Sequence, residues 1–186
     1  GLAQERKAIP ARWFYDMRGS ELFEDITRLP EYYPTRAEVA ALKEHGDELG
    51  KAIGPGRNVV EFGAGSSAKT PLLLDRIAPS AYVPIDISGD FLRESCEDFA
   101  KRFPSLPVYP VEADFTRPVP IPAELAEHER LGFFPGSTIG NLEPAAAVDL
   151  LREMRRTLGN GSLLLIGMDR IKDRDVLVSA YDDSAG

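Results

Sequence analysis

The sequence predicts an α/β fold in which a doubly wound, mostly parallel, Rossmann-like sheet follows a helical N-terminal region. Strand-like and helix-like segments alternate from Asn58 onward, which favours parallel strands joined by helices. A small-residue turn, Gly63-Ala64-Gly65, follows the first strand-like segment. An acidic residue, Asp86, follows the second, and a carboxylate about 20 residues after such a turn is placed to bind ribose hydroxyls. We therefore expect a domain that binds an adenosine-containing cofactor.

Residues 1–54 carry helix signals without a strand signal, so we expect an N-terminal helical region ahead of a sheet domain at 55–186. Ser20 is expected to cap a helix whose apolar positions share one face and which ends before Pro30. The segment Thr35-Arg36-Ala37-Glu38 has the pattern of a capping box, in which hydroxyl and carboxylate each accept an orphan N–H. A second helix is expected from there to about Ile53.

The sheet domain should contain five strands, with a helix after most of them. We expect strands at 58–62, 81–87, 108–113, 131–134 and 162–168 and helices at 68–77, 89–103, 144–158 and 173–180. The first of these helices could instead begin at Thr70, because Pro71 suits a first helical position. Parallel strands end at one edge of a sheet, and ligands bind there. The residues at or just after the ends of the five strands are Gly63, Asp86, Asp114, Gly136 and Asp169.

Composition excludes several classes of function. A net charge of −8 argues against nucleic acid or an anionic membrane surface as the main partner. A single cysteine, Cys96, permits no intramolecular disulfide, and two histidines without a Cys/His cluster make a metal site unexpected. No apolar run is long enough to span a membrane, and no signal peptide opens the sequence. We expect a cytoplasmic monomer.

Residues around the glycine turn supply candidate cofactor contacts, and each has a plainer alternative. Glu61 and the turn would lie beneath the cofactor, or would form an ordinary strand-to-helix connection. Asp86 would bind ribose, or would cap a helix. Lys69 would pair with a ligand carboxylate, or would lie in solvent. Asp114, with the backbone after it, would bind an adenine edge, or would hold a turn before Thr116.

Two further segments supply candidate substrate contacts. Residues 136–142 follow the fourth strand, with two glycines around small hydroxyl residues. Asn141 in this loop has an amide that both donates and accepts hydrogen bonds. The pair Tyr32-Tyr33 lies outside the sheet domain and would either pack in a core or place tyrosine hydroxyls over the strand edge.

Long motifs in the chain resemble a known family. The segments Tyr15–Phe23 (YDMRGSELF) and Ile26–Arg36 (ITRLPEYYPTR) closely resemble the N-terminal signature of the histidine Nα-methyltransferases of ergothioneine biosynthesis. The match continues at 61–70 (EFGAGSSAKT), 136–142 (GSTIGNL) and 180–183 (AYDD). The resemblance covers nearly the whole chain from about Tyr15, and its N-terminal motif is more specific than the glycine turn.

The resemblance implies a class I methyltransferase that uses S-adenosylmethionine and trimethylates the α-amino group of L-histidine, giving hercynine. By matching motif, the cofactor would be held by Tyr15, Gly63, Lys69, Asp86, Asp114 and Phe115. Among these, Gly63 and Lys69 would hold the methionine portion with Tyr15 nearby. The ribose would bind Asp86, and the adenine would bind Asp114 and Phe115.

The resemblance also implies where the amino-acid substrate binds. Its amino and carboxylate groups would be surrounded by Tyr32, Gly136, Asn141 and Tyr181, with Tyr32 and Asn141 orienting the amine. Members of the family continue into a second domain that completes the substrate pocket, so we expect this chain to be a fragment that lacks that domain.

Three other functions stay open at this point. A related enzyme could methylate another amino acid or amine, such as a tryptophan derivative. A nicotinamide-dependent oxidoreductase would share the fold, but the turn lacks a strong pyrophosphate fingerprint and no catalytic Tyr/Lys or His pair is evident. A cofactor-binding fragment without turnover is the third.

Overall fold

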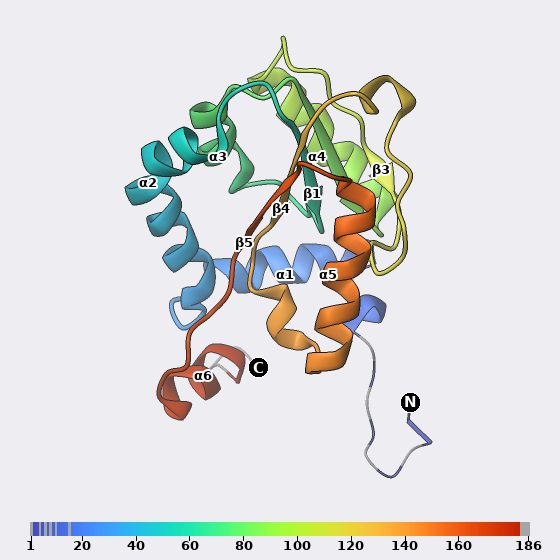
Figure 1. Ribbon diagram of the computed structural model, residues 1–186. Helices are drawn as coiled ribbons and strands as arrows, with labels where there is room; N and C mark the ends of the chain where they lie inside the picture. The colour runs from blue at the N-terminus through green and yellow to red at the C-terminus, as the bar shows by residue number, and fades with distance from the viewer. Residues whose placement is uncertain are drawn as a thin grey trace.

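The computed structural model describes residues 2, 3, 5, 7, 9, 11–14 and 16–182. Its centre is a sheet of five parallel strands in the order β3-β2-β1-β4-β5, with helices on both faces (Figure 1). The strands are β1 Asn58–Phe62, β2 Ala81–Asp86, β3 Val111–Glu112, β4 Arg130–Phe134 and β5 Leu163–Ile166. The predicted doubly wound parallel sheet is confirmed.

Six α-helices and three short 3-10 helices surround the sheet in the described residues. The α-helices are α1 Met17–Arg28, α2 Tyr33–Ile53, α3 Thr70–Ile77, α4 Gly89–Arg102, α5 Pro144–Leu158 and α6 Arg174–Tyr181. The 3-10 helices are η1 Ala11–Phe14, η2 Ala123–Leu125 and η3 Thr138–Asn141. No helix of the described residues has the length and apolar character that crossing a bilayer requires.

Strand order reverses between β1 and β4. The chain moves outward from β1 to β2 and β3, then returns to place β4 on the other side of β1. Val60 of β1 is therefore in register with Val83 of β2 and with Gly132 of β4. In doubly wound sheets, loops that leave neighbouring strands in opposite directions open a crevice at such a reversal, and ligands bind there.

The central strands are buried on both faces, and alternate residues supply two separate cores. Val59, Tyr82 and Leu131 pack with residues of α2, α3 and α4. Val60 and Val83 point the other way and pack with residues of α5. Near-continuous apolar runs in β1 and β2 follow from this two-sided burial.

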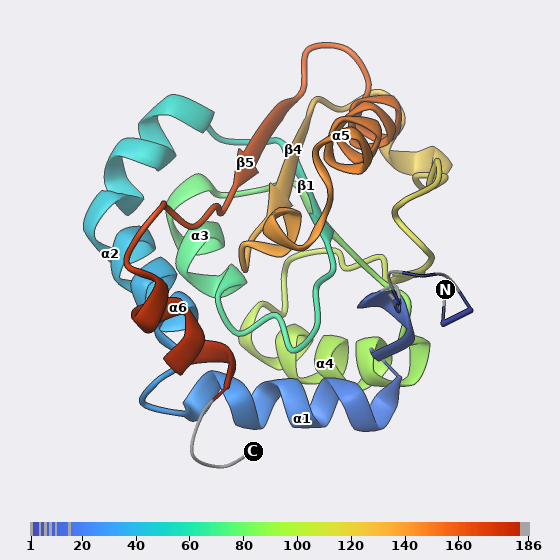
Figure 2. The same cartoon turned by 90° about the horizontal axis from the view of Figure 1, so that it is seen from below.

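Helix α2 approaches α3 closely because two glycines face it. A Cβ built at Gly50 would lie 2.8 Å from the carbonyl oxygen of Arg76, and one built at Gly46 would lie 3.3 Å from the Arg76 side chain. Arg76 also donates to Asp47 at 2.8 Å. This contact fixes α2 beside the sheet, with its N-terminal turn at the end of the molecule that α1 crosses (Figures 1 and 2).

Both predicted helix caps in the N-terminal region were wrong. Asp16 caps α1, since its Oδ1 accepts the Gly19 N–H at 2.8 Å, and Ser20 lies buried inside the helix. Helix α2 begins at Tyr33, with proline in its first turn and no side-chain cap, so Thr35 lies within the helix and no capping box forms.

The third strand is shorter than predicted. Only Val111 and Glu112 pair with β2, and Val108 contributes an isolated bridge to Tyr82. The interruption has a local cause, because Pro107 and Pro110 flank that bridge and proline has no N–H to donate to a ladder.

Candidate cofactor and substrate site

The C-terminal ends of the strands point toward α1, and Figure 2 looks onto this edge with α1, α2 and α6 arranged around it. Helix α1 contacts the edge directly, since Ser66 in the turn after β1 donates to Glu24 of α1. The site is built from the β1–α3 turn, the end of β2, the loop after β3 and the loop after β4.

The glycine turn needs backbone angles that favour glycine. Gly63 and Gly65 have φ values of 73° and 53°. The N–H groups of Gly63 and Ala64 both donate to the Ile85 carbonyl, at 2.9 and 3.0 Å, which fastens the turn to β2. A Cβ built at Gly65 would meet no atom within 4 Å. The turn therefore presents bare backbone to open space, as close approach of a ligand requires.

Asp86 lies against this turn. Its Oδ2 accepts the Gly65 N–H at 3.0 Å, and its Oδ1 accepts the Ser88 N–H at 3.0 Å. The side chain is buried, and each carboxylate oxygen keeps capacity for a further hydrogen bond. The expected adjacency of the second acidic residue and the glycine turn is confirmed, with the carboxylate already oriented by backbone donors.

Glu61 supports the turn from beneath. Thr70 Oγ1 donates to its Oε2 at 2.6 Å, and the Tyr82 hydroxyl donates to the same oxygen at 2.5 Å. Because the Tyr82 proton is used there, the 2.9 Å contact between Ser67 Oγ and the Tyr82 oxygen has Ser67 as donor. Burial raises the pKa of the Glu61 carboxyl to about 7, although hydrogen bonds from Thr70 and Tyr82 oppose the shift.

Lys69 is held by a glutamate of α2 rather than lying free in solvent. Its Nζ lies 2.6 Å from Oε2 of Glu38. The Gly136 N–H, after β4, donates to both oxygens of the same carboxylate at 3.0 Å. Two residues expected to contact ligands, Lys69 and Gly136, are thus brought together by a third that sequence reasoning placed in a capping box. That expectation was wrong for Glu38.

The ring of Phe115 packs against the glycine turn at Gly63. Its ring carbon Cε1 would lie 3.4 Å from a Cβ at Gly63, and its ring packs edge-on against Phe62 and Phe134. Asp114 holds its own turn, since its Oδ1 accepts from the Thr116 N–H at 3.0 Å and from the Thr116 hydroxyl at 2.6 Å. The turn before Thr116, which was the plainer expectation for Asp114, is therefore present. This turn places Phe115 beside the predicted cofactor site.

Three aromatic residues meet where α1, α2 and α6 converge. Tyr32 is 5% exposed, and its ring packs edge-on against Phe23 at 6.1 Å and Tyr181 at 5.7 Å between centroids. Tyr181 itself is exposed, as is Asn141 at the end of η3. The structure thus joins Tyr32 and Tyr181, two of the predicted substrate contacts, across 149 positions of sequence. Tyr15 lies outside the described residues.

A second connection between α2 and the sheet was not anticipated. The Tyr33 hydroxyl donates to Asp169 after β5, and Lys172 Nζ lies 2.6 Å from Asp169 Oδ1 and 3.9 Å from the Tyr33 ring centroid. The Asp169 N–H donates to Ser137 at 3.0 Å. The loops after β4 and β5 and the start of α2 therefore form one bonded unit.

One sequence signal could have revealed Glu38. In α2 the inward residues Leu42, Gly46, Leu49 and Ile53 recur at helical spacing, and Glu38 stands one turn before Leu42 on the same face. A carboxylate on an inward face needs a partner. The partner could not be read from the sequence, because Lys69 and Gly136 join it only through the tertiary fold.

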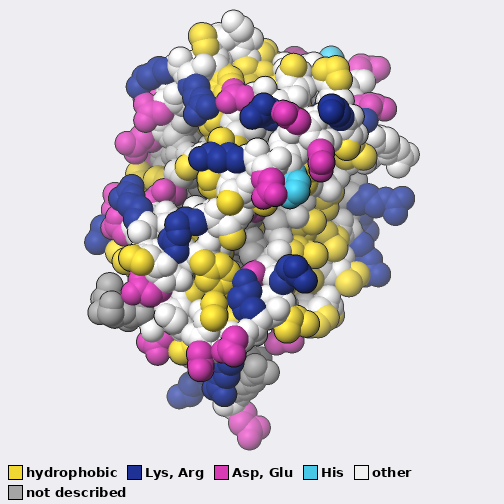
Figure 3. All heavy atoms as spheres, turned by 90° about the vertical axis from the view of Figure 1, so that its left-hand side faces the viewer, with side chains coloured by type: hydrophobic (Ala, Val, Ile, Leu, Met, Phe, Trp, Pro, Cys, Tyr) yellow, Lys and Arg dark blue, Asp and Glu magenta, His cyan; other side chains and the backbone are white. Residues whose placement is uncertain are grey.

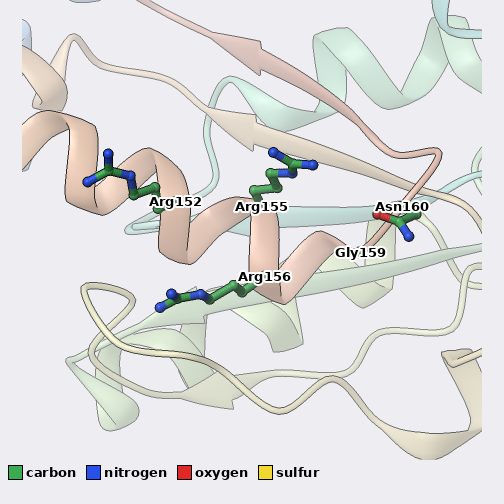
Figure 4. A pocket seen from close by; sticks show the side chains of 5 residues that line it. All are labelled: Arg152, Arg155, Arg156, Gly159 and Asn160. Carbon is green, nitrogen blue, oxygen red and sulfur yellow. The ribbon is translucent and has the colours of Figure 1, made fainter.

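None of the predicted site residues that the structure describes lines either of two surface hollows. One, of about 440 Å³, is lined by Arg152, Arg155, Arg156, Gly159 and Asn160, near the start of β5. Its three arginine side chains point in different directions (Figure 4) and do not converge on one ligand position. The other, of about 460 Å³, lies along α1 and η1. No group of three or more metal-ligating side chains occurs among the described residues.

On the face shown in Figure 3, basic and acidic side chains are interspersed, with no continuous surface of one sign. That face offers no extended basic patch of the kind that binds a phosphate backbone.

A family model described as histidine-specific, SAM-dependent methyltransferase matches residues 1–186. The chain belongs to this family. Within these histidine-specific methyltransferases, it is 40% identical over 190 residues to a histidine N-alpha-methyltransferase of Mycolicibacterium smegmatis, a match that covers 100% of this chain and 58% of that protein. It is 30% identical over 189 residues to ergothioneine biosynthesis protein 1 of Neurospora crassa, covering 97% of this chain and 21% of that protein.

A solved structure has the same fold as this member of the family. A putative S-adenosyl-L-methionine-dependent methyltransferase from Methanococcus maripaludis matches 98% of this chain and 74% of its own with a TM-score of 0.58, at 17% sequence identity. The chain spans 58% of its mycolicibacterial relative, so the relative contains residues with no counterpart here.

Proposed function

We propose that the protein containing this chain transfers methyl groups from S-adenosylmethionine to the α-amino group of L-histidine, forming hercynine in ergothioneine biosynthesis. The observation that carries the proposal is the Asp86 carboxylate bonded to the glycine turn at the strand reversal, in a chain of this family. In this proposal the chain consists of a helical N-terminal region, 1–54, and a cofactor-binding sheet domain, 55–186. The protein would be a monomer in the cytoplasm.

The described residues fit the cofactor. The open backbone at Gly65 and the remaining acceptor capacity of Asp86 suit a ribose, and the ring of Phe115 beside Gly63 offers a surface for adenine. The Lys69 ammonium suits the carboxylate of the methionine portion. S-adenosylmethionine supplies a methyl group already activated by a positive sulfur, so the protein needs no metal to activate it.

The side chains have the task of positioning the amine. A reaction between two aligned groups gains rate from their held geometry, and this task falls to Tyr32 and Asn141. Packing of Tyr32 between Phe23 and Tyr181 restricts its ring, so its hydroxyl keeps a fixed direction. A site closed from water would favour the uncharged amine by lowering its pKa, and solvent would take the released proton.

Cofactor class is tested by calorimetry on the full-length protein with S-adenosylhomocysteine and with NAD, because the oxidoreductase alternative shares the fold. We expect binding of S-adenosylhomocysteine and none of NAD. Preferential binding of NAD would reject the proposal.

Substrate class is tested by a methylation assay with histidine, tryptophan and histamine. We expect histidine to be methylated most efficiently. Histamine lacks the carboxylate, so its failure would locate recognition at that group. A preference for tryptophan would reject histidine as substrate and leave methyl transfer intact.

A further inference from the structure

Glu38 joins four segments of the edge through one carboxylate. It extends from the second turn of α2, its Oε2 lies 2.6 Å from Lys69 Nζ, and both oxygens lie 3.0 Å from the Gly136 nitrogen. The fourth segment is the end of β5, where a Cβ at Gly167 would collide with Oε1. Only 15% of the Glu38 side chain and 18% of the Lys69 side chain are exposed.

The fold provides a fitted position for this carboxylate. Gly136 has a φ of 84°, which favours glycine and directs its N–H at Glu38, and Gly167 leaves the space that a methyl group would fill. The Gly167 N–H donates to the Phe134 carbonyl at 2.9 Å, which keeps the end of β5 beside the β4 loop. The carboxylate is therefore part of the packed edge.

We propose that Glu38 is a positioning residue that holds the Lys69 ammonium for the carboxylate of the cofactor and fixes the start of α2 to the sheet. The inference rests on the function proposed above. An ammonium has three donors, and the contact with Glu38 uses one. Two donors are left for a ligand, so a ligand carboxylate would meet an ammonium whose position is already fixed by Glu38.

The alternative is that Glu38 occupies the position of the ligand's carboxylate and leaves when the ligand binds. Departure would break the ion pair with Lys69 and leave the partly buried Gly136 N–H without its acceptor. Helix α2 also resists movement, since it is bonded through Tyr33 to Asp169 and packs through Gly50 on α3. These contacts favour a fixed carboxylate.

The test uses the full-length protein and two ligands that differ in one group: S-adenosylhomocysteine and its analogue without the carboxylate. Glu38→Gln keeps the shape and an acceptor for Gly136 but removes the charge that holds Lys69. We expect calorimetry to show about tenfold weaker binding of S-adenosylhomocysteine and less than about twofold change for the analogue, as for loss of one charge-assisted contact.

Three further variants sharpen the test. Lys69→Ala should abolish the preference for the carboxylate-bearing ligand, and adding Glu38→Gln to it should cause no further loss. Gly167→Ala displaces Glu38 without altering it, so it should reproduce the selective loss and serves if Glu38→Gln does not fold. Glu44→Gln, an exposed glutamate on the same helix, should leave both affinities unchanged.

Each remaining outcome contradicts the proposal in its own way. If Glu38→Gln weakened the binding of both ligands equally, Glu38 would have a structural role only. Tighter binding of S-adenosylhomocysteine would show that Glu38 competes with the ligand. Unchanged binding, with a wild-type protein that does bind, would reject the role of Glu38 alone. A wild-type protein that binds neither ligand would reject the proposed function itself.

Discussion

Backbone groups at the two ends of the sheet form hydrogen bonds with side chains of opposite charge. At the C-terminal end, carboxylates accept backbone N–H groups: Asp86 from Gly65 and Ser88, and Glu38 from Gly136. At the N-terminal end, arginines donate to carbonyls. Arg57 donates to Ile53 at the end of α2, and Arg130 donates to Leu158 at the end of α5.

The difference follows from the direction of the helices. In a parallel α/β fold the crossover helices begin near the strand C-termini and end near the strand N-termini, so free N–H groups gather at one end and free carbonyls at the other. The Asp86 carboxylate at the C-terminal end can accept further hydrogen bonds and lies beside open backbone. The arginines at the N-terminal end mainly donate to the free carbonyls at the ends of helices. Changes to the open groups of the first end should therefore affect ligand binding. Changes at the second end, and changes to groups buried beneath the glycine turn such as Glu61, should affect stability.

The largest expected effect is on the pH dependence of stability through Glu61. Burial raises its pKa from 4.5 to about 7 in the folded state, so the native protein retains a proton that the unfolded chain has released. Wild-type stability should therefore fall, relative to Glu61→Gln, by about 3 kcal/mol as pH rises from 4.5 to 7. Urea unfolding across that range measures it.

The matched control is a carboxylate at the other end of the sheet. Glu129 pairs with Arg57 at 2.9 Å but is 63% exposed, so Glu129→Gln should give a curve nearly parallel to wild type. Parallel curves for Glu61→Gln as well would contradict the buried-carboxylate account.

The next effect concerns cofactor affinity. Asp86→Ala removes the carboxylate proposed to bind ribose and also the acceptor of the Gly65 N–H. It should weaken S-adenosylhomocysteine binding by about 1–3 kcal/mol in calorimetry, as when paired polar groups lose a charged partner. Asp47→Ala, which removes an exposed ion pair with Arg76, is the control and should not change the affinity. Unaltered binding by Asp86→Ala would remove the ribose assignment.

A third comparison separates turnover from binding with two asparagines at opposite ends. Asn141→Ala, after β4, should lower kcat about tenfold or more in the full-length protein because the amine loses an orienting group, while cofactor affinity stays the same. Asn160→Ala, in the turn before β5, should change neither quantity. Steady-state kinetics on histidine decides between them, and normal turnover of Asn141→Ala would rule out its role.

The smallest effect is expected at the N-terminal end. Asn58 is fully buried at the start of β1, and neither atom of its side-chain amide has a hydrogen-bond partner among the described residues. Replacing an unsatisfied buried amide by an apolar group of similar shape is stabilising, so Asn58→Leu should raise the free energy of unfolding by about 1 kcal/mol. Ligand affinity should not change. A loss of stability on urea unfolding would show that the amide is satisfied.

Local patterns were sufficient for the sheet and for one adjacency in the site. Alternating strand and helix signals predicted all five strands, although the third is shorter than expected, and the spacing from the glycine turn to Asp86 predicted an adjacency that the fold provides. Both rest on neighbouring strands joined by one crossover, which leaves few possible arrangements.

Contacts between remote segments could not be predicted in this way. The pattern from Thr35 to Glu38 suggested a local cap, but tertiary partners bind the carboxylate instead. The Tyr33–Asp169 contact likewise depends on how α2 docks, which no local pattern encodes. The roles assigned to the candidate residues by resemblance stay predictions until ligands are measured.

The bonds that fasten α2 have a consequence for synthesis of the chain. Glu38 and Gly136 are 98 positions apart, and Tyr33 and Asp169 are 136 apart. At about 5–20 residues per second, a ribosome needs roughly 7–27 s to add the residues that separate the second pair. The start of α2 must wait that long for its last partner, so the ligand edge is completed only after most of these residues have been translated.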